Sequence, residues 1–185
     1  AIDLAKNNLC GLTLASSFDT NKKILNSIQS NYLMIDETND IIGTEICGSI
    51  KNVMAIIFGM LEEMKVSNST KALFFTEALK EIEHLIEFYH GNPKTITSLA
   101  GIGDFYLTCN SKESRNYQLG IMIASSDKEK VKEYLENNTV EGFYTLLSIY
   151  KMITTNPISS PLIEKLYQII FEDKKKEDLL ITFTK

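Results

Sequence analysis

The 185-residue sequence has little cysteine, and its cysteines are not arranged for cross-linking. Cys10, Cys47 and Cys109 form no Cys-x-x-Cys pair and leave an odd count. This pattern fits a reducing compartment better than a secreted scaffold held by disulfides. Residues 1–4 also lack the basic start and the long apolar core of a signal peptide. We therefore expect a cytoplasmic protein. Because the sequence opens without Met and within a predicted helix, we expect it to be the later part of a longer chain.

Long hydrophobic runs and excess positive charge are also missing. The longest apolar candidate, residues 53–61, is about half the roughly 18–20 residues that span a bilayer. The formal net charge of −5 argues against a general nucleic-acid or anionic-membrane surface. We expect no nucleic-acid partner and no membrane insertion. A phosphate site on this chain should therefore be small and specific.

The sequence offers no metal site and no activated thiol. Its two histidines, His84 and His90, stand six residues apart on one predicted helix, so they do not share a face as i, i+4 ligands would. Cys109 has no histidine nearby in the sequence to activate it. The lysine run at 174–176 is predicted to be a solvated face, and no internal repeat is present.

The first 40 residues alternate between helix and strand patterns. Residues 1–8 are predicted to be the tail of a helix, and residues 10–17 a short, mostly apolar strand. Asp19 is a candidate N-cap for a helix that reaches residue 28. A second strand is predicted at 32–35, followed by a polar turn at 36–40. This rhythm indicates the end of an α/β domain.

Residues 41–185 are predicted to be all-α. A long helix over 41–64 is interrupted by Gly43, Gly48 and Gly59, for which close backbone packing is the simplest reason. Ser69 or Asn68 is a candidate cap for a second helix that runs to about residue 89. Further helices are predicted after residue 115, over about 140–153, and over 161–171.

Lys51 and Asp104 are the first candidate site residues. An ammonium group among apolar neighbours is costly unless it is paired or neutralised, and such a lysine can act as a general acid or base. The alternative is a snorkelling lysine whose head reaches water. Gly101 and Gly103 would allow a tight bend that brings backbone close to a ligand. Asp104 then either holds a lysine in place or caps a helix.

Arginine is nearly absent, since Arg115 is the single arginine among 19 basic residues. Guanidinium grips phosphate or carboxylate with a planar fork that lysine lacks. Ser114, Arg115 and Asn116 would place a hydroxyl, a fork and an amide at the start of a helix, where free backbone N–H groups already favour an anion. The three residues together are therefore a candidate anion site.

Three segments together carry a resemblance to a known family: GTEICGSIKNVMAI, then LAGIGDFYLTCNSKESRNYQLG, then VEGFYTL. In this order and spacing they resemble the C-terminal half of bacterial-type NAD(P)-dependent glycerol-3-phosphate dehydrogenase. The resemblance runs from LTLASS near the start to PISSPLIEKLYQIIF near the end. It implies an oxidoreductase that interconverts dihydroxyacetone phosphate and sn-glycerol 3-phosphate with NAD or NADP and supplies phospholipid synthesis.

The resemblance also implies the fold and the domain boundaries. Residues 1–40 would be the end of a Rossmann dinucleotide-binding domain. Residues 41–185 would be the all-α substrate domain of the 6-phosphogluconate dehydrogenase-like type, so that the chain as a whole is mainly α. The glycine-rich βαβ unit would lie upstream of residue 1, so this chain alone should bind a dinucleotide poorly and be inactive.

By resemblance, Lys51 is the catalytic acid/base and also contacts the substrate. Cofactor contacts fall on Arg115 and on a turn formed by Thr139, Val140 and Glu141. The matching substrate-binding positions are Lys51, Asn52, Asp104, Thr108, Ser114, Arg115 and Asn116. No metal site is implied.

The sequence departs from the family pattern at several positions and leaves other functions open. Ser67 stands where a glycine is usual, Glu77-Ala78 where Arg-Gly is usual, Phe105 where leucine is usual, and Tyr117-Gln118 where further arginines often follow. These changes bear on packing, substrate affinity and cofactor choice. The alternatives are a non-catalytic helical or dimerisation module and a related dehydrogenase for another phosphorylated hydroxy substrate. A homodimer also stays open.

Overall fold

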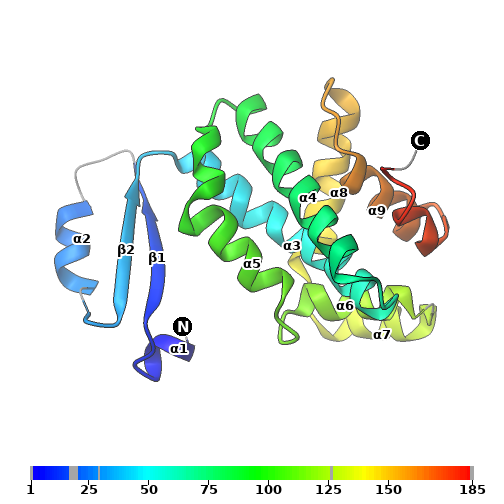
Figure 1. Ribbon diagram of the computed structural model, residues 1–185, viewed down its shortest axis with the longest axis horizontal. Helices are drawn as coiled ribbons and strands as arrows, with labels where there is room; N and C mark the ends of the chain where they lie inside the picture. Colours follow the sequence, from blue (N-terminus) through cyan, green and yellow to red (C-terminus); the bar gives the residue numbers. More distant parts are fainter. Residues whose placement is uncertain (1, 17–20, 29, 126, 184–185) are drawn as a thin grey trace.

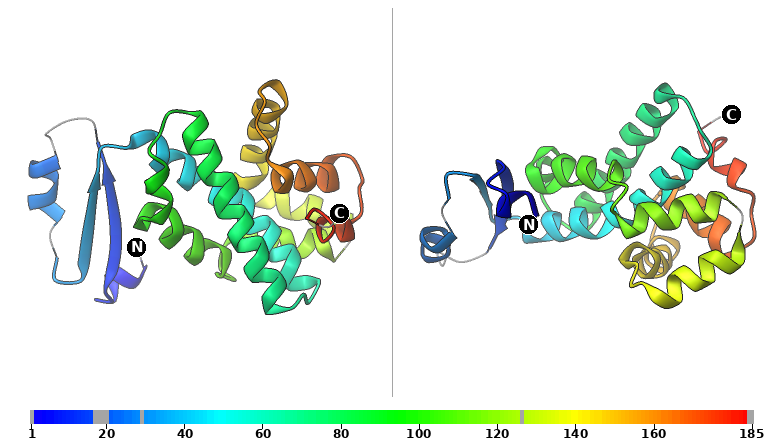
Figure 2. Two further views of the ribbon diagram at one scale, coloured as in Figure 1. Left: turned by 45° about the horizontal axis from the view of Figure 1, so that its top comes forward. Right: turned by 90° about the horizontal axis from the view of Figure 1, so that it is seen from below.

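A small parallel sheet precedes a bundle of helices, and the two parts lie side by side along the long axis of the molecule (Figure 1). The computed structural model describes residues 2–16, 21–28, 30–125 and 127–183. The bundle contributes most of the chain, so the fold is mainly α with an α/β segment at its N-terminal end, as predicted. Two further views show the sheet standing apart from the far end of the bundle (Figure 2).

The α/β segment consists of α1 (Ile2–Ala5), β1 (Cys10–Ala15), α2 (Asn21–Ile28) and β2 (Leu33–Thr38). The two strands are parallel, with register from Cys10 opposite Leu33 to Ala15 opposite Thr38. The first strand is shorter than predicted. The second is longer, because residues 36–38 pair with 13–15 where a polar turn was predicted. The predicted cap Asp19 lies outside the described residues.

The bundle follows the predicted order of helices, with two further helices over residues 104–109 and 128–137 that were given no predicted range. The helix over 104–109 is short, and the helix over 128–137 is strongly polar and has no buried residue, so neither stands out as an apolar stretch. Short 3-10 segments η1 (Pro93–Thr97) and η3 (Lys176–Leu179) and a π-helical turn η2 (Leu99–Gly103) complete the chain. The α-helices are α3 (Ile41–Glu63), α4 (Asn68–Phe88), α5 (Asp104–Cys109), α6 (Arg115–Ala124), α7 (Lys128–Asn137), α8 (Glu141–Thr155) and α9 (Pro161–Phe171).

Helix α3 is the centre of the bundle. Residues 53–61 are all buried, as the apolar run predicted, and α3 packs against α4, α5, α6 and α8 (Figure 1). By length and composition alone, the 23-residue helix is apolar enough to cross a membrane. Because its apolar residues are covered by neighbouring helices, we interpret it as the core helix of the bundle.

Helix α4 begins one residue earlier than predicted. Ser67, rather than Asn68 or Ser69, is the N-cap, because its backbone is extended (φ −65°, ψ 158°) and its Oγ accepts from the backbone N–H of Thr70 at 3.1 Å. A hydroxyl at this position satisfies one of the free N–H groups of the first turn. The departure from glycine at Ser67 therefore has a structural use.

Of the three glycines in α3, Gly59 is packed against backbone as predicted, whereas Gly43 is packed closely against side chains. A Cβ on Gly43 would come within 2.0 Å of Oδ2 of Asp40, and a Cβ on Gly59 would come within 2.0 Å of the Tyr117 carbonyl oxygen on α6. The prediction is wrong for Gly48, where a Cβ would meet no described heavy atom within 4 Å. Gly48 therefore needs another explanation.

A buried carboxylate joins α4 to the start of α9. Glu81 is 4% exposed and accepts from the backbone N–H of Leu162 at 2.6 Å and of Ile163 at 3.4 Å. The N-cap residue of α9, Ser160, makes no side-chain cap hydrogen bond, so Glu81 supplies the cap from another helix. Burial raises the pKa of Glu81 to about 8 against the effect of these two N–H donors.

Candidate functional site

Lys51 on α3 and Asp104 at the start of α5 form an ion pair in which Nζ of Lys51 donates to Oδ2 of Asp104. The two side chains are 21% and 36% exposed, so the pair lies at the edge of the bundle and within reach of a ligand. Asp104 thus holds the lysine, one of the two roles considered for it. Lys51 is a paired lysine, rather than one that merely extends to water.

The chain before Asp104 is shaped by a π-helical turn. Gly101 has ψ −107°, and a Cβ on it would come within 2.2 Å of the Ile96 carbonyl oxygen. The close approach at Gly101 is therefore to protein backbone. The turn delivers Asp104 to the first position of α5, where Thr108 donates from Oγ1 to the Asp104 carbonyl at 2.7 Å.

A chain of hydrogen bonds joins α3, α6 and α8 beside this pair. Nδ2 of Asn116 donates to Oδ1 of Asn52 at 2.9 Å, and Nδ2 of Asn52 donates to Oε2 of Glu141 at 3.0 Å. The backbone N–H of Gly142 donates to Oδ1 of Asn116 at 2.8 Å. A Cβ on Gly142 would come within 2.4 Å of the Asn52 carbonyl oxygen, so only glycine allows α8 to begin so close to α3.

The two asparagines are occupied by protein partners. Asn52 and Asn116 are 9% and 7% exposed, and the oxygen of each accepts from one of the neighbours described above. A buried amide with satisfied partners is costly to disturb. We therefore interpret both side chains as groups that hold α3, α6 and α8 together next to Lys51 and Glu141. The sequence pattern gave no sign of this network, since its members are 26 to 89 residues apart.

Arg115 is the first residue of α6 and is exposed. Ser114 is the N-cap of this helix, since its Oγ accepts from the backbone N–H of Tyr117 at 3.4 Å. The helix thus begins where the sequence predicted. The Arg115 carbonyl accepts from the Tyr134 hydroxyl at 3.3 Å. Within residues 2–16, 21–28, 30–125 and 127–183, no ion pair involves the guanidinium group. Its donors are free to meet an anion.

The remaining predicted residues form the turn before α8. Thr139 is exposed, Val140 is fully buried, and Glu141 is an exposed first residue of the helix. The buried valine anchors the turn, while the threonine and the glutamate face outward. Through Asn52, the Glu141 carboxylate is tied to the helix that carries Lys51. The structure thus links the lysine, the aspartate, the two asparagines and the glutamate in one neighbourhood.

The buried thiols are unsuited to nucleophilic chemistry. Burial, together with the negative charges of Asp40 and Asp104, raises the pKa of Cys47 to about 11. Burial also raises the pKa of Cys109 well above its usual value, although Lys51 nearby opposes the shift. Because the thiolate is the nucleophile, both cysteines stay as unreactive thiols at neutral pH. Among the described residues, no group of three or more His, Cys, Asp or Glu side chains could hold a metal ion.

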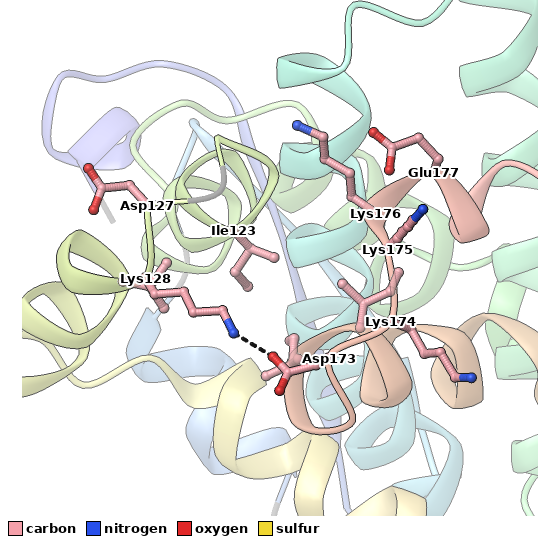
Figure 3. A pocket seen from close by; sticks show the side chains of 11 residues that line it. Ile123, Asp127, Lys128, Asp173, Lys174, Lys175, Lys176 and Glu177 are labelled. Atoms are coloured by element: carbon pink, nitrogen blue, oxygen red, sulfur yellow. Dashed lines mark hydrogen bonds and ion pairs between the residues drawn. The ribbon is translucent and has the colours of Figure 1, made fainter.

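A hollow of about 530 Å³ lies elsewhere, between α7, the end of α6 and the segment after α9 (Figure 3). Lys128 reaches across it to pair with Asp173. Lys174 and Lys175 are exposed, as predicted, but Lys176 donates from Nζ to the Ala124 carbonyl and helps to hold the end of α6. None of the predicted site residues lines this hollow.

Comparison with known proteins identifies the relatives of the chain. The sequence profile described as the NAD-dependent glycerol-3-phosphate dehydrogenase C-terminus matches residues 40–181. A protein named glycerol-3-phosphate dehydrogenase [NAD(P)+] from Onion yellows phytoplasma is 34% identical over 92% of this chain and 54% of its own length. A protein of the same name from Staphylococcus epidermidis is 37% identical over 86% of this chain and 48% of its own length.

Solved structures agree with the sequence comparison. A crystal structure of glycerol-3-phosphate dehydrogenase from Coxiella burnetii matches 96% of this chain and 55% of that one, with a TM-score of 0.89 and 28% identity. A structure from Plasmodium falciparum matches with a TM-score of 0.89 at 23% identity and shows the fold alone. The chain spans about half the length of the curated relatives that it matches.

Proposed function

Because this chain belongs to the family of the NAD-dependent glycerol-3-phosphate dehydrogenase C-terminus, we propose that it is the substrate-binding half of an oxidoreductase. The reaction is the interconversion of dihydroxyacetone phosphate and sn-glycerol 3-phosphate. Residues 41–185 would form the substrate domain, and residues 1–40 the end of a dinucleotide-binding domain whose remainder precedes this chain. The product would serve phospholipid synthesis in the cytoplasm.

The observation that carries this proposal is the Lys51–Asp104 pair at the edge of the bundle. Carbonyl reduction needs a proton donor beside the oxygen on which negative charge develops, and an ammonium group supplies both the proton and the charge. Asp104 would keep Lys51 oriented toward that oxygen. Lys51 would give one proton as the carbonyl becomes a hydroxyl, and would take it back in the reverse direction.

The free guanidinium of Arg115 supports a phosphorylated substrate. At the start of α6, its fork and the first-turn N–H groups point to an anion that is held bidentately. A phosphate bound away from the reacting carbon provides binding energy that orients the carbonyl toward Lys51. We assign Ser114 and Thr108 to the same substrate site. Asn52 and Asn116 belong to it as positioning residues, because their amides are already satisfied.

The cofactor would be NAD or NADP, which supplies the hydride when it is bound. In this chain the residues suited to contact it are Arg115 and the exposed members of the turn, Thr139 and Glu141, with Val140 as the buried anchor of that turn. Glu141 is joined through Asn52 to the helix that carries Lys51, so a cofactor bound at Glu141 would keep a fixed position relative to the proton donor. Most of the dinucleotide site would come from the preceding domain.

The complete enzyme, with its dinucleotide-binding half, tests this proposal. We expect oxidation of reduced nicotinamide cofactor that depends on dihydroxyacetone phosphate. Lys51→Ala should abolish this turnover while leaving cofactor binding, measured by fluorescence titration, nearly unchanged. The control is Lys71→Ala. Lys71 lies on α4 and pairs with Glu62, which is on α3 about 16 Å along the helix from Lys51. Near-normal turnover in Lys51→Ala would contradict the assigned role.

Two other functions would give different results. A non-catalytic dimerisation module would show no cofactor oxidation with any substrate, and Lys51→Ala would have no measurable effect on it. A dehydrogenase for another phosphorylated hydroxy compound would oxidise cofactor with that compound and turn over dihydroxyacetone phosphate poorly. The intact Lys51–Asp104 pair favours catalysis over the module. A homodimer is compatible with either and is tested by sedimentation.

A further inference from the structure

Gly48 is a glycine that nothing in the described chain requires. A Cβ added to it would meet no described heavy atom within 4 Å, and no described glycine has a positive φ. Glycine inside a helix lowers its stability relative to alanine, because the unfolded chain has more freedom to lose. Gly43 and Gly59 on the same helix are explained by contacts that a Cβ would violate. At Gly48 no contact among the described residues explains why glycine is present.

The position of Gly48 suggests what uses the free surface. Residues three and four apart lie on one face of a helix, so Gly48 shares a face with Lys51 and Asn52. The Gly48 carbonyl accepts from Nδ2 of Asn52 at 3.3 Å, and the same amide donates to Oε2 of Glu141 at 3.0 Å. The bare patch therefore shares a helix face with the proposed proton donor, and Asn52 joins it to the proposed cofactor contact.

We propose that the Cα of Gly48 is a binding surface for the nicotinamide ring of the dinucleotide. A flat ring approaches backbone most closely where no side chain projects. The reacting atoms of ring and substrate must come within about 3–3.5 Å of each other, and Lys51 must reach the substrate oxygen at the same time. A ring on the face shared by Gly48 and Lys51 meets both needs. The inference rests on the proposed function, which supplies the dinucleotide.

The test uses Gly48→Ala and Gly48→Leu in the complete enzyme. Affinity for NADH and NADPH is measured by fluorescence titration without substrate, and the melting temperature is measured without cofactor. For Gly48→Ala we expect the melting temperature to rise by about 2–4 °C, because the helix gains a better helix former. We expect the dissociation constant of the preferred cofactor to increase about tenfold or more, and further for Gly48→Leu.

Ser49→Ala is the matched control. Ser49 is the next residue of α3; it is exposed and lines an apolar groove with Ile42 and Met152, and successive helix residues point about 100° apart. Replacing serine by alanine also improves helix propensity, but at a position off the face of Lys51. The control should keep the wild-type cofactor affinity.

Three outcomes would overturn the inference. An unchanged cofactor affinity in both Gly48 variants would mean that no ring uses the surface. A lowered melting temperature would mean that a Cβ meets protein from the preceding domain. An increase only in the KM for dihydroxyacetone phosphate would place the substrate there instead. If the wild-type enzyme bound NADH but did not act on dihydroxyacetone phosphate, the proposed function would fail while the binding measurement would still decide the role of Gly48.

Discussion

Asn116 donates to Asn52 at 2.9 Å across 64 residues of sequence, and both amides are nearly removed from solvent. The bond joins the first turn of α6 to the centre of α3. The pair sits between the lysine–aspartate pair and the start of α8, so it couples three helices at the place where the proposed chemistry occurs. Substitutions at this pair and at the neighbouring charged residues should therefore affect stability and catalysis separately.

Replacing Asn116 by Ala should destabilise the protein. The change leaves the Gly142 N–H and Oδ1 of Asn52 without partners, and each buried polar group left unpaired costs about 1–3 kcal/mol. Chemical denaturation followed by circular dichroism measures the loss. In a double-mutant cycle with Asn52→Ala, the combined loss should be smaller than the sum of the two, by about 0.5–3 kcal/mol. Strict additivity would mean that the two amides do not act together.

Arg115→Lys should weaken substrate binding while leaving the fold intact. A bidentate charged contact worth about 1.5–3 kcal/mol corresponds to roughly tenfold to hundredfold in affinity. The measurement is the KM for dihydroxyacetone phosphate in the complete enzyme. Arg115→Gln is the comparison, because it removes the charge as well as the fork and should be worse. A wild-type KM and turnover in the lysine variant would show that the fork is dispensable.

Glu81→Gln should change how stability depends on pH. The folded-state pKa of Glu81 is raised from 4.5 to about 8, so its stabilising contribution is complete below the unfolded pKa and is lost as pH rises through about 8. The loss is on the order of a few kcal/mol. Wild type should therefore lose stability relative to Glu81→Gln between about pH 4.5 and about pH 8. Urea midpoints across this range measure the difference.

Glu87→Gln is the control for that experiment, since Glu87 is exposed on the same helix. Its profile should run parallel to that of wild type. If the profile of Glu81→Gln were also parallel to wild type, the buried carboxylate would not titrate as described.

Gly59→Ala should destabilise the bundle by about 1–3 kcal/mol or more, because overpacking forces helices apart. The added Cβ would come within 2.0 Å of the Tyr117 carbonyl oxygen, and α6 would have to move. Thermal unfolding measures the effect. Gly48→Ala is the matched comparison on the same helix, and it should shift the melting temperature in the opposite direction. Equal shifts would contradict the steric account of both glycines.

Much of the helical architecture was predictable, because apolar periodicity along a helix is a local signal. The long central helix and the last helix were placed within a residue or two, and the last one begins and ends as predicted. The short helix over 104–109 and the polar helix over 128–137 were missed, the second because few of its residues are apolar and none is buried. The second strand was cut short because its last three residues are held by pairing with β1, which the sequence of that segment alone does not show.

The candidate site also has features that the sequence showed and features that only the structure revealed. Lys51, Asp104 and Arg115 stood out as residue types in unusual surroundings, and the resemblance added their proposed roles. That Asp104 pairs with Lys51, and that Asn52 and Asn116 are already bonded to protein, could not be read from the sequence. Glu81 gave no signal at all, because its partners are 81 and 82 residues away.

The sequence by itself determined that the chain has an α/β start and a helical body, which residues are candidates for the proposed chemistry, and which family the chain resembles. Periodicity, caps and motif order depend on residues that are close in the sequence, so they can be recognised without a structure. Only the tertiary structure decided which groups meet. Contacts of α3 with α6 and α8 depend on how closely the backbones approach, and glycines at the crossings, such as Gly59 and Gly142, permit that approach.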